Sequence, residues 1–330
     1  MTKTTRRLSL LKPTGHLTLG NYLGALRGMA AEQHRSTCFF GIADLHALTV
    51  THDPGALREL TREMQILLLA CGLDPEHATL FVQSHVPAHT ELSYLLESTA
   101  YTGELNRMIQ FKEKGRDRPQ TRVSLYTYPA LMAADILLYR ATQVPVGDDQ
   151  RQHVELTRDL AVRFNTTYGE VFTVPEITTS EVAARVMDLQ DPTVKMGKSH
   201  DSGAGIIYLL DEPDAVRRKL SRAVTDSEAG QDAVRHDPVT KPGVSNLLEI
   251  IAACEDDEPS RVAATLTSYG QLKQRATDAV LAVLAPIRKR YDELAGCPEV
   301  VARVYAEGAL RCREETAPVL AGAREAMGLS

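Results

Sequence analysis

Apolar and polar residues alternate along the first 187 positions with two different periods. Short aliphatic or β-branched runs of strand length are followed by longer stretches in which apolar residues recur every three or four positions. Because strands that alternate with helices pair in parallel, this pattern predicts an α/β fold: a Rossmann-like doubly wound parallel sheet with helices on both faces. The expected strands are 6–12, 38–50, 78–84 and 144–147, and the expected helices are 21–34, 54–72, 90–111, 128–141 and 148–164.

The helix expected over 54–72 carries signals at both of its ends. Asp53 is a side-chain acceptor directly before the helix, and Pro54 suits the first helical position. Gly72 follows the last periodic residue, where a left-handed backbone often ends a helix.

The pattern changes after about Asp188. Helical periodicity dominates from there, and no strand is expected beyond Tyr208. We therefore expect a first domain over 1–187 and an all-helical second domain over 188–297, with the last helices, from about Pro298, packing back on the first domain. The expected helices of this part are 211–224, 245–254, 259–270 and 272–294.

Charge and cysteine content narrow the class of protein. The chain has 37 basic and 43 acidic residues among 330, and this net charge of −6 argues against coating by nucleic acid over its whole surface. The segment Arg107–Arg122 is an exception, with six basic and two acidic residues, a local charge of +4. No apolar run approaches the roughly 18–20 residues of a membrane span. The five cysteines form no C-x-x-C pair, so we expect a cytoplasmic protein with neither a disulfide frame nor a zinc site.

Two loops carry candidate chemistry. "PTGHLTLGN" (Pro13–Asn21) follows the first strand, and Gly15 and Gly20 would let a base or a phosphate approach the backbone closely. The alternative is a connection whose glycines serve only the turn. In "VKMGKS", Lys195 and Lys198 would suit a polyphosphate in a loop that closes; a pair of lysines in water is the alternative.

Together these loops resemble the two signature sequences of class I aminoacyl-tRNA synthetases, with "TLGN" in place of HIGH and "KMGKS" in place of KMSKS. Further blocks resemble the bacterial tryptophanyl-tRNA synthetase family in order and spacing. They are "IADLHALTV", "QFKEKG", "TYPALMAADILLY", "VPVGDDQRQHVELTRDLAVRFN" and "RAVTDS". The resemblance covers nearly the whole chain.

The resemblance implies a tryptophan–tRNA ligase that uses ATP with Mg²⁺ to activate L-tryptophan and then charges tRNA(Trp). It implies a homodimer that contacts through the nucleotide domain, and an anticodon-binding role for the helical domain. Lys195, Lys198, Thr18 and Lys114 are the expected catalytic residues. The ATP site is expected to comprise Lys12, Pro13, Thr14, Gly20, Asn21, Gly147, Asp148, Asp149, Val186, Lys195, Met196, Gly197, Lys198 and Ser199.

The amino-acid pocket is expected on the helix "YPALMAADILLY". Tyr128, Met132, Asp135 and Tyr139 share one of its faces. A carboxylate among apolar neighbours needs a donor, and an indole N–H needs an acceptor; the resemblance implies that Asp135 binds the indole N–H of tryptophan. A structural arginine beside Asp135 is the alternative. By resemblance, the remaining pocket residues are Gln150, His46, Val144 and Val146.

Two histidines and two departures from the family pattern add expectations. His85 and His89 are spaced like metal ligands, but without a third ligand nearby we expect both at the surface, and no metal site. The family usually has "SGIQPTG" where this chain has "SLLKPTG". Lys12 would therefore place an ammonium beside the substrate carboxylate, which suggests a second, inhibitor-tolerant synthetase. Gly197 replaces the central serine of the lysine loop.

Two other functions remain open from the residues alone. One is a tyrosine-specific relative of the same fold. The other is a catalytically degenerate binding protein, because a retained fold does not guarantee a retained activity.

Overall fold

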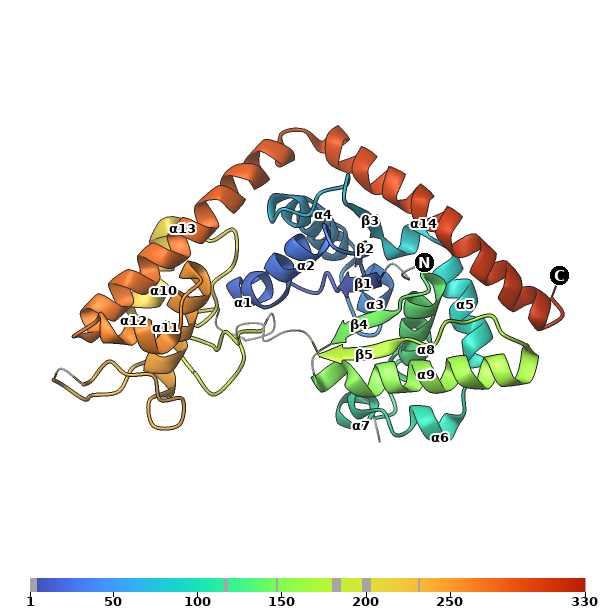
Figure 1. The fold of residues 1–330 in the computed structure, drawn as a ribbon, viewed down its shortest axis with the longest axis horizontal. Helices are drawn as coiled ribbons and strands as arrows, with labels where there is room; N and C mark the ends of the chain where they lie inside the picture. The colour runs from blue at the N-terminus through green and yellow to red at the C-terminus, as the bar shows by residue number, and fades with distance from the viewer. Residues whose placement is uncertain are drawn as a thin grey trace.

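Five parallel strands form one sheet in the order β3-β2-β1-β4-β5 (Figure 1). The structure is a computed structural model that describes residues 5–115, 118–146, 148–179, 185–197, 203–230 and 232–329. The strand order reverses between β1 and β4, and in such sheets ligands bind beyond the carboxyl ends of the strands at the reversal. The strands are β1 Arg6–Leu11, β2 Thr37–Ile42, β3 Ala78–Val82, β4 Gln143–Val146 and β5 Glu176–Thr179.

The doubly wound parallel sheet expected from the sequence is therefore confirmed. The expectation was incomplete at one edge, because it did not include β5. That strand, "EITT", is short and mostly polar, so it lacks the apolar run by which the other strands were found.

Both faces of the sheet are buried at β2 and β3, which explains why these strands are apolar on both sides. Phe40 of β2 and Leu80 of β3 belong to the apolar core on one face, and their neighbours Phe39 and Phe81 belong to the core on the other. The first face is covered by α4 (Pro54–Ala70); the second is covered by α5 (Ala88–Glu97), α8 (Val123–Leu138) and α9 (Asp148–Tyr168).

The signals at the ends of α4 act as expected. The Asp53 carboxylate accepts a hydrogen bond from the backbone N–H of Ala56 at 2.8 Å, and the helix begins at Pro54. Gly72 lies just beyond its end with φ +94°, a conformation that favours glycine.

Other element boundaries differ from the sequence-based ones. The helix expected over 90–111 is three: α5, α6 (Thr102–Leu105) and α7 (Ile109–Lys114). The hydroxyls of Ser98 and Thr99 donate to carbonyls of the last turn of α5, which favours ending the helix there. The strand expected over 38–50 ends at Ile42 and is followed by α3 (Asp44–Ala47). The stretch after the first loop comprises α1 (Leu19–Asn21), the π-helical turn Tyr22–Leu26 and α2 (Arg27–Glu32).

The second half is helical, and its described residues after 203 contain no strand. The apolar core of the first sheet face continues without a break through these helices, and the domain boundary at residue 187 stays a prediction. No helix in the described part of the chain is long and apolar enough to cross a membrane. The helices are α10 Pro213–Ser221, α11 Pro242–Glu255, α12 Pro259–Ala264, α13 Tyr269–Ala295 and α14 Pro298–Ala326.

The last helix, α14, returns over the sheet, while α13 runs along the helical region, so the two form an inverted V across the molecule (Figure 1). A Cβ atom on Gly308 would lie 1.7 Å from the carbonyl oxygen of Leu80 in β3. Only glycine therefore lets α14 rest directly on the backbone of the sheet.

Candidate active site

The two signature loops lie against each other, although about 175 positions separate them in the chain. A Cβ built on Gly20 would meet the carbonyl oxygen of Met196 at 3.5 Å and Cβ of Val186 at 3.6 Å. These are ordinary van der Waals distances, so packing within the protein does not require a glycine at this position. A single site that spans both loops is thereby supported for the described residues.

Backbone pairing holds both loops in place. Leu19 N donates to the carbonyl of Ile207 at 2.8 Å, and Leu209 N donates to that of Leu17 at 2.9 Å. Lys195 pairs with Met187 across an antiparallel bridge. The lysine segment therefore stands on a short turn beside the first loop, with Lys195 exposed and Met196 buried.

The side chain of Asn246 ties this turn to the helical region. From α11, its amide accepts from Met187 N at 2.9 Å and donates to Met187 O at 3.0 Å. Asn246 is 3% exposed. The sequence analysis missed this residue, because an asparagine within an amphipathic helix gives no signal of a distant backbone partner.

The side chains of Thr18 and Asn21 each accept a hydrogen bond from the backbone of the other residue. The hydroxyl of Thr18 accepts from Asn21 N at 3.2 Å, and the Asn21 side-chain oxygen accepts from Thr18 N at 3.0 Å. This reciprocal cap fixes the start of α1. Thr18 is fully buried, and its role near the phosphates stays a prediction.

Asp135 lies at the centre of a buried polar cluster. Its Oδ1 accepts from Gln83 Nε2 at 2.7 Å and from His89 Nδ1 at 2.6 Å, and its Oδ2 accepts from His46 Nε2 at 2.7 Å. Burial raises the pKa of this carboxyl, but the hydrogen bonds and charges of His46 and His89 outweigh that effect and hold it below its ordinary value. The cluster thus contains a carboxylate, and among the described residues its partners are histidines and an amide, not the arginine considered above.

The expectation that His89 lies at the surface is wrong. His89 is fully buried, whereas His85 is exposed. The apolar stretch that follows it, "TELSYLL", places α5 against α8, and a buried carboxylate on α8 requires donors from that neighbour. His46 lies beside Asp135, as the resemblance implied.

Tyr128 on α8 lies beside this cluster and beside Lys12. The rings of Tyr128 and His46 meet edge to face, 6.1 Å apart, and the Tyr128 hydroxyl is hydrogen-bonded to His153. Burial raises the pKa of Tyr128. Met132 is half-buried and Val144 is buried, so both belong to the apolar surroundings.

Lys12 lies between the cluster and the basic segment. Its Nζ is 5.6 Å from the centroid of the Tyr128 ring. The side chain is still exposed to solvent, but partial burial lowers its pKa, and the nearby Lys114 ammonium lowers it further. Lys12 and Lys114 therefore approach the same space from different elements, Lys12 from the residue that follows β1 and Lys114 from the end of α7.

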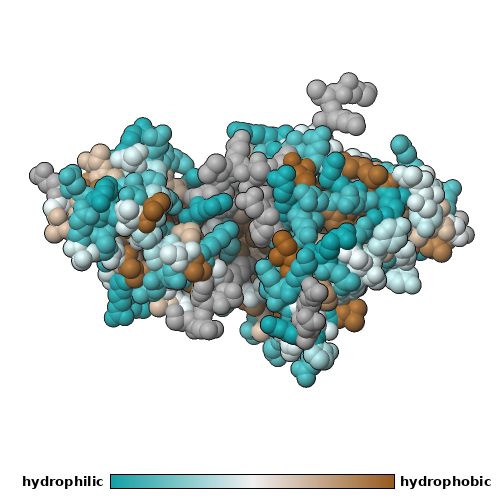
Figure 2. All heavy atoms as spheres, turned by 90° about the horizontal axis from the view of Figure 1, so that it is seen from below, coloured by the Kyte–Doolittle hydropathy of each residue, from teal (hydrophilic) through white to brown (hydrophobic). Residues whose placement is uncertain are grey.

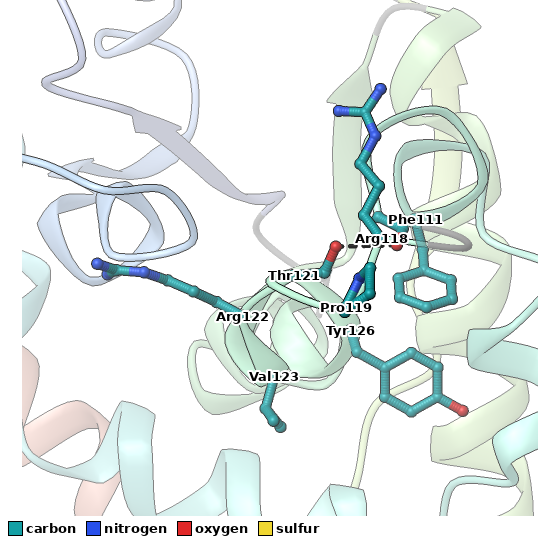
Figure 3. Close-up of a pocket in the computed structure, with 8 residues that line it drawn as sticks. Phe111, Arg118, Pro119, Thr121, Arg122, Val123 and Tyr126 are labelled. Atoms are coloured by element: carbon teal, nitrogen blue, oxygen red, sulfur yellow. Dashed lines mark hydrogen bonds between the residues drawn. The ribbon is translucent and has the colours of Figure 1, made fainter.

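The basic segment frames an open hollow of about 500 Å³ between α7 and α8 (Figure 3). The rings of Phe111 and Tyr126 meet at 4.8 Å on one side. Arg118 and Arg122 also line the hollow, and their side chains extend in different directions (Figure 3). Arg122 donates to the carbonyl of Leu48 at 3.2 Å. The side chain of Gln152 on α9 accepts from Ile109 N at 2.9 Å and so holds the start of α7.

Several expected site residues cannot be placed in this geometry. Gly147, Lys198 and Ser199 lie outside the described residues, and the side chains of Asp148, Asp149 and Val146 are not described. Pro13 is buried, Thr14 is exposed, and Gln150 and Gly197 are half-buried. Their roles stay predictions.

A family profile described as "tRNA synthetases class I (W and Y)" matches residues 2–285. The chain belongs to this family. It is 57% identical to tryptophan–tRNA ligase 1 of Streptomyces coelicolor, over 98% of this chain and 97% of that one.

Solved structures of synthetases of this class have the same fold as this chain. Tryptophanyl-tRNA synthetase of Mycoplasma pneumoniae superposes with a TM-score of 0.89 at 35% identity, over 99% of each chain. That of Campylobacter jejuni, a complex with ADP and tryptophan, gives 0.85 at 31% identity, over 98% of this chain and all of the other. The synthetase fold therefore extends over the whole described chain.

Proposed function

We propose that the protein is a tryptophan–tRNA ligase, active in the cytoplasm. It activates L-tryptophan with ATP and transfers it to the 3′ end of tRNA(Trp). The observation that carries this conclusion is the 57% identity, along nearly the whole chain, to a relative named tryptophan–tRNA ligase 1. The tyrosine-specific and degenerate alternatives have no comparable support.

In the first step, a carboxylate oxygen of tryptophan attacks the α-phosphorus of ATP. The bond from that phosphorus to the bridging oxygen breaks, and pyrophosphate leaves with the electron pair. No protein nucleophile is required, so catalysis consists of placement and of stabilising the charge on the phosphates. In the second step, a ribose hydroxyl at the end of tRNA attacks the activated carbonyl, and AMP leaves.

The two adjacent signature loops would bind ATP. Gly20, whose position tolerates close approach, would form the floor, with Pro13, Thr14 and Asn21 around it and Val186 beside the adenine. Lys195 and Lys198 would hold the departing pyrophosphate, and Lys114 the α-phosphate side. Mg²⁺ would arrive bound to the ATP phosphates and neutralise part of their charge; the described residues contain no group of three or more metal-ligating side chains that could hold an ion.

Asp135 would accept the hydrogen bond of the indole N–H. Its carboxylate is almost fully buried, so a substrate that lacks a donor would leave it with an empty acceptor position away from water. Tyr128 and Gln150 would bind the α-ammonium group of the substrate, and Met132, Val144 and Val146 would line the indole.

The basic segment Arg107–Arg122 is the expected contact for the acceptor end of tRNA. It combines positive charge with the exposed edge of an aromatic pair, which suits a sugar-phosphate backbone and an unpaired base. The face in Figure 2 is mainly hydrophilic, with separate apolar patches. Tyr94 and Tyr101, 69% and 62% exposed, are apolar surface available to a homodimer interface in the nucleotide domain.

Lys12 is proposed to tune the binding of tryptophan analogues, as expected for an inhibitor-tolerant enzyme. Its ammonium lies near Tyr128 and Lys114, where the substrate carboxylate and the α-phosphate would meet. We expect Lys12→Gln to change the inhibition constant of indole-based tryptophan analogues about tenfold, the effect of one charged contact. An unchanged constant would refute this role.

The activity is tested by exchange of labelled pyrophosphate into ATP, with tryptophan and with tyrosine. Exchange that depends on tryptophan alone is the expected result. Exchange with tyrosine alone would favour the tyrosine-specific relative, and no exchange with either amino acid would indicate a degenerate binding protein.

A further inference from the structure

The two oxygens of the Asp135 carboxylate are differently occupied. A carboxylate offers about four acceptor positions, two on each oxygen. Gln83 and His89 fill both positions on Oδ1, whereas His46 fills one on Oδ2. Among the described residues, the remaining position is therefore on Oδ2, the oxygen that His46 contacts.

The side of the cluster away from the pocket continues deeper into the core. His89 Nε2 lies 2.9 Å from the Tyr139 hydroxyl, and this hydroxyl is hydrogen-bonded to Cys312 of α14. Each of these three side chains is less than 2% exposed. His89 Nδ1 donates to the Asp135 carboxylate, and the Tyr139 hydroxyl holds the other ring nitrogen, Nε2, from the side of the core.

We propose that His89, held in its orientation by the Tyr139 hydroxyl, is a positioning residue for tryptophan recognition. It fills an acceptor position on Oδ1 from the side of the core. Oδ2 is therefore the oxygen left to accept from the substrate. His89 does not touch the substrate in this arrangement. Its effect passes through the orientation of Asp135, so it bears on substrates with an N–H at this position. The inference rests on the proposed role of Asp135.

The test compares tryptophan with its analogue 3-(benzothiophen-3-yl)alanine, which has sulfur in place of the indole N–H. Pyrophosphate exchange gives kcat and KM for both in the wild type, His89→Leu, His89→Asn and Tyr139→Phe. His89→Leu removes the donor to Oδ1. His89→Asn keeps an N–H donor near the Nδ1 position, and Tyr139→Phe removes only the hydroxyl. His85→Leu is the matched control, because His85 is exposed and only four positions away.

We expect His89→Leu to raise the KM for tryptophan about 10–100-fold, as for loss of a hydrogen bond to a charged group, with a smaller change in kcat. The analogue should change less than threefold, so the preference for tryptophan should shrink. His89→Asn should recover most of the preference, Tyr139→Phe should lose part of it, and His85→Leu should behave as the wild type.

An equal loss for both substrates in His89→Leu and Tyr139→Phe would overturn the proposal, because it would indicate a purely structural role. If His89→Leu does not fold, Tyr139→Phe decides alone by the same ratio. The role of Asp135 is tested separately. If the wild type does not prefer tryptophan, or if Asp135→Asn keeps the preference, the assignment of Asp135 fails. If Asp135→Asn loses the preference and the His89 and Tyr139 variants keep it, only the present inference fails.

Discussion

Asp135 and Lys195 are charged groups of one proposed site in opposite environments. The Asp135 carboxylate is 1% exposed and accepts from three fixed side chains, whereas Lys195 stands exposed on a short turn. A buried charge with fixed partners cannot rearrange without large cost, which suits discrimination between amino acids. A charge in water moves easily, which suits a phosphate that must be held and then released.

The largest effect should come from replacing the buried carboxylate of Asp135. We expect Asp135→Asn to lower kcat/KM for tryptophan about 100–1000-fold, because the neutral amide adds a donor to the three already present. Pyrophosphate exchange across a range of tryptophan concentrations measures this. A loss below tenfold would mean that the fixed carboxylate does not decide recognition.

Replacing the exposed Lys195 should change the rate of the reaction and not the binding of tryptophan. We expect Lys195→Met to lower kcat of exchange about 100-fold, as for loss of one group that stabilises transition-state charge, with the KM for tryptophan unchanged. Lys289→Met, which alters an exposed lysine of α13, is the control. A raised tryptophan KM in Lys195→Met would contradict the division of roles.

The anchor of the lysine turn should have an intermediate effect. Asn246→Ala leaves both polar groups of the Met187 backbone without their partner, so the turn should shift and the KM for ATP should rise about tenfold. Asn246→Asp keeps the acceptor for Met187 N and should lose less. A lower melting temperature with an unchanged KM for ATP would reduce Asn246 to a stabilising residue.

The smallest effect should appear in how the free energy of unfolding depends on pH. The pKa of Asp135 is lowered from its ordinary value of 3.8, so its ionised form stabilises the fold fully above that value. This contribution is lost as the pH falls through the lower pKa of the folded state. The free energy of unfolding of the wild type, measured in urea, should fall relative to that of Asp135→Asn as the pH drops below 3.8. Parallel curves for the two proteins would show that the carboxylate is not stabilised by folding.

The sequence predicted those parts of the fold that depend on local signals. Asp53 and Gly72 mark the ends of α4 because capping and left-handed turns act within a few residues. The mostly polar strand β5 was missed because its place in the sheet depends on pairing with β4, which periodicity does not encode.

In the candidate site, too, some residues could be predicted from the sequence and others could not. Asp135 was predicted from its apolar helix face, and the adjacency of the two loops followed from the resemblance. His89 was misjudged, and Asn246 was overlooked, because each is defined by a partner far away in the chain. A search for donors to a buried carboxylate, begun at Asp135, would have pointed to His89 at the start of the helix that packs on α8.

The bend between α13 and α14 has a practical consequence. Gly308 fixes α14 on the backbone of β3, and Gly296 and Cys297 form the bend between α13 and α14. Cys297 is exposed, whereas burial raises the pKa of Cys38 to about 11 and of Cys71 and Cys312 to about 12, and Cys254 also rises to about 12. A maleimide dye should therefore label Cys297 selectively in the unmutated protein. Its fluorescence would report any movement at the bend between α13 and α14 when substrates bind.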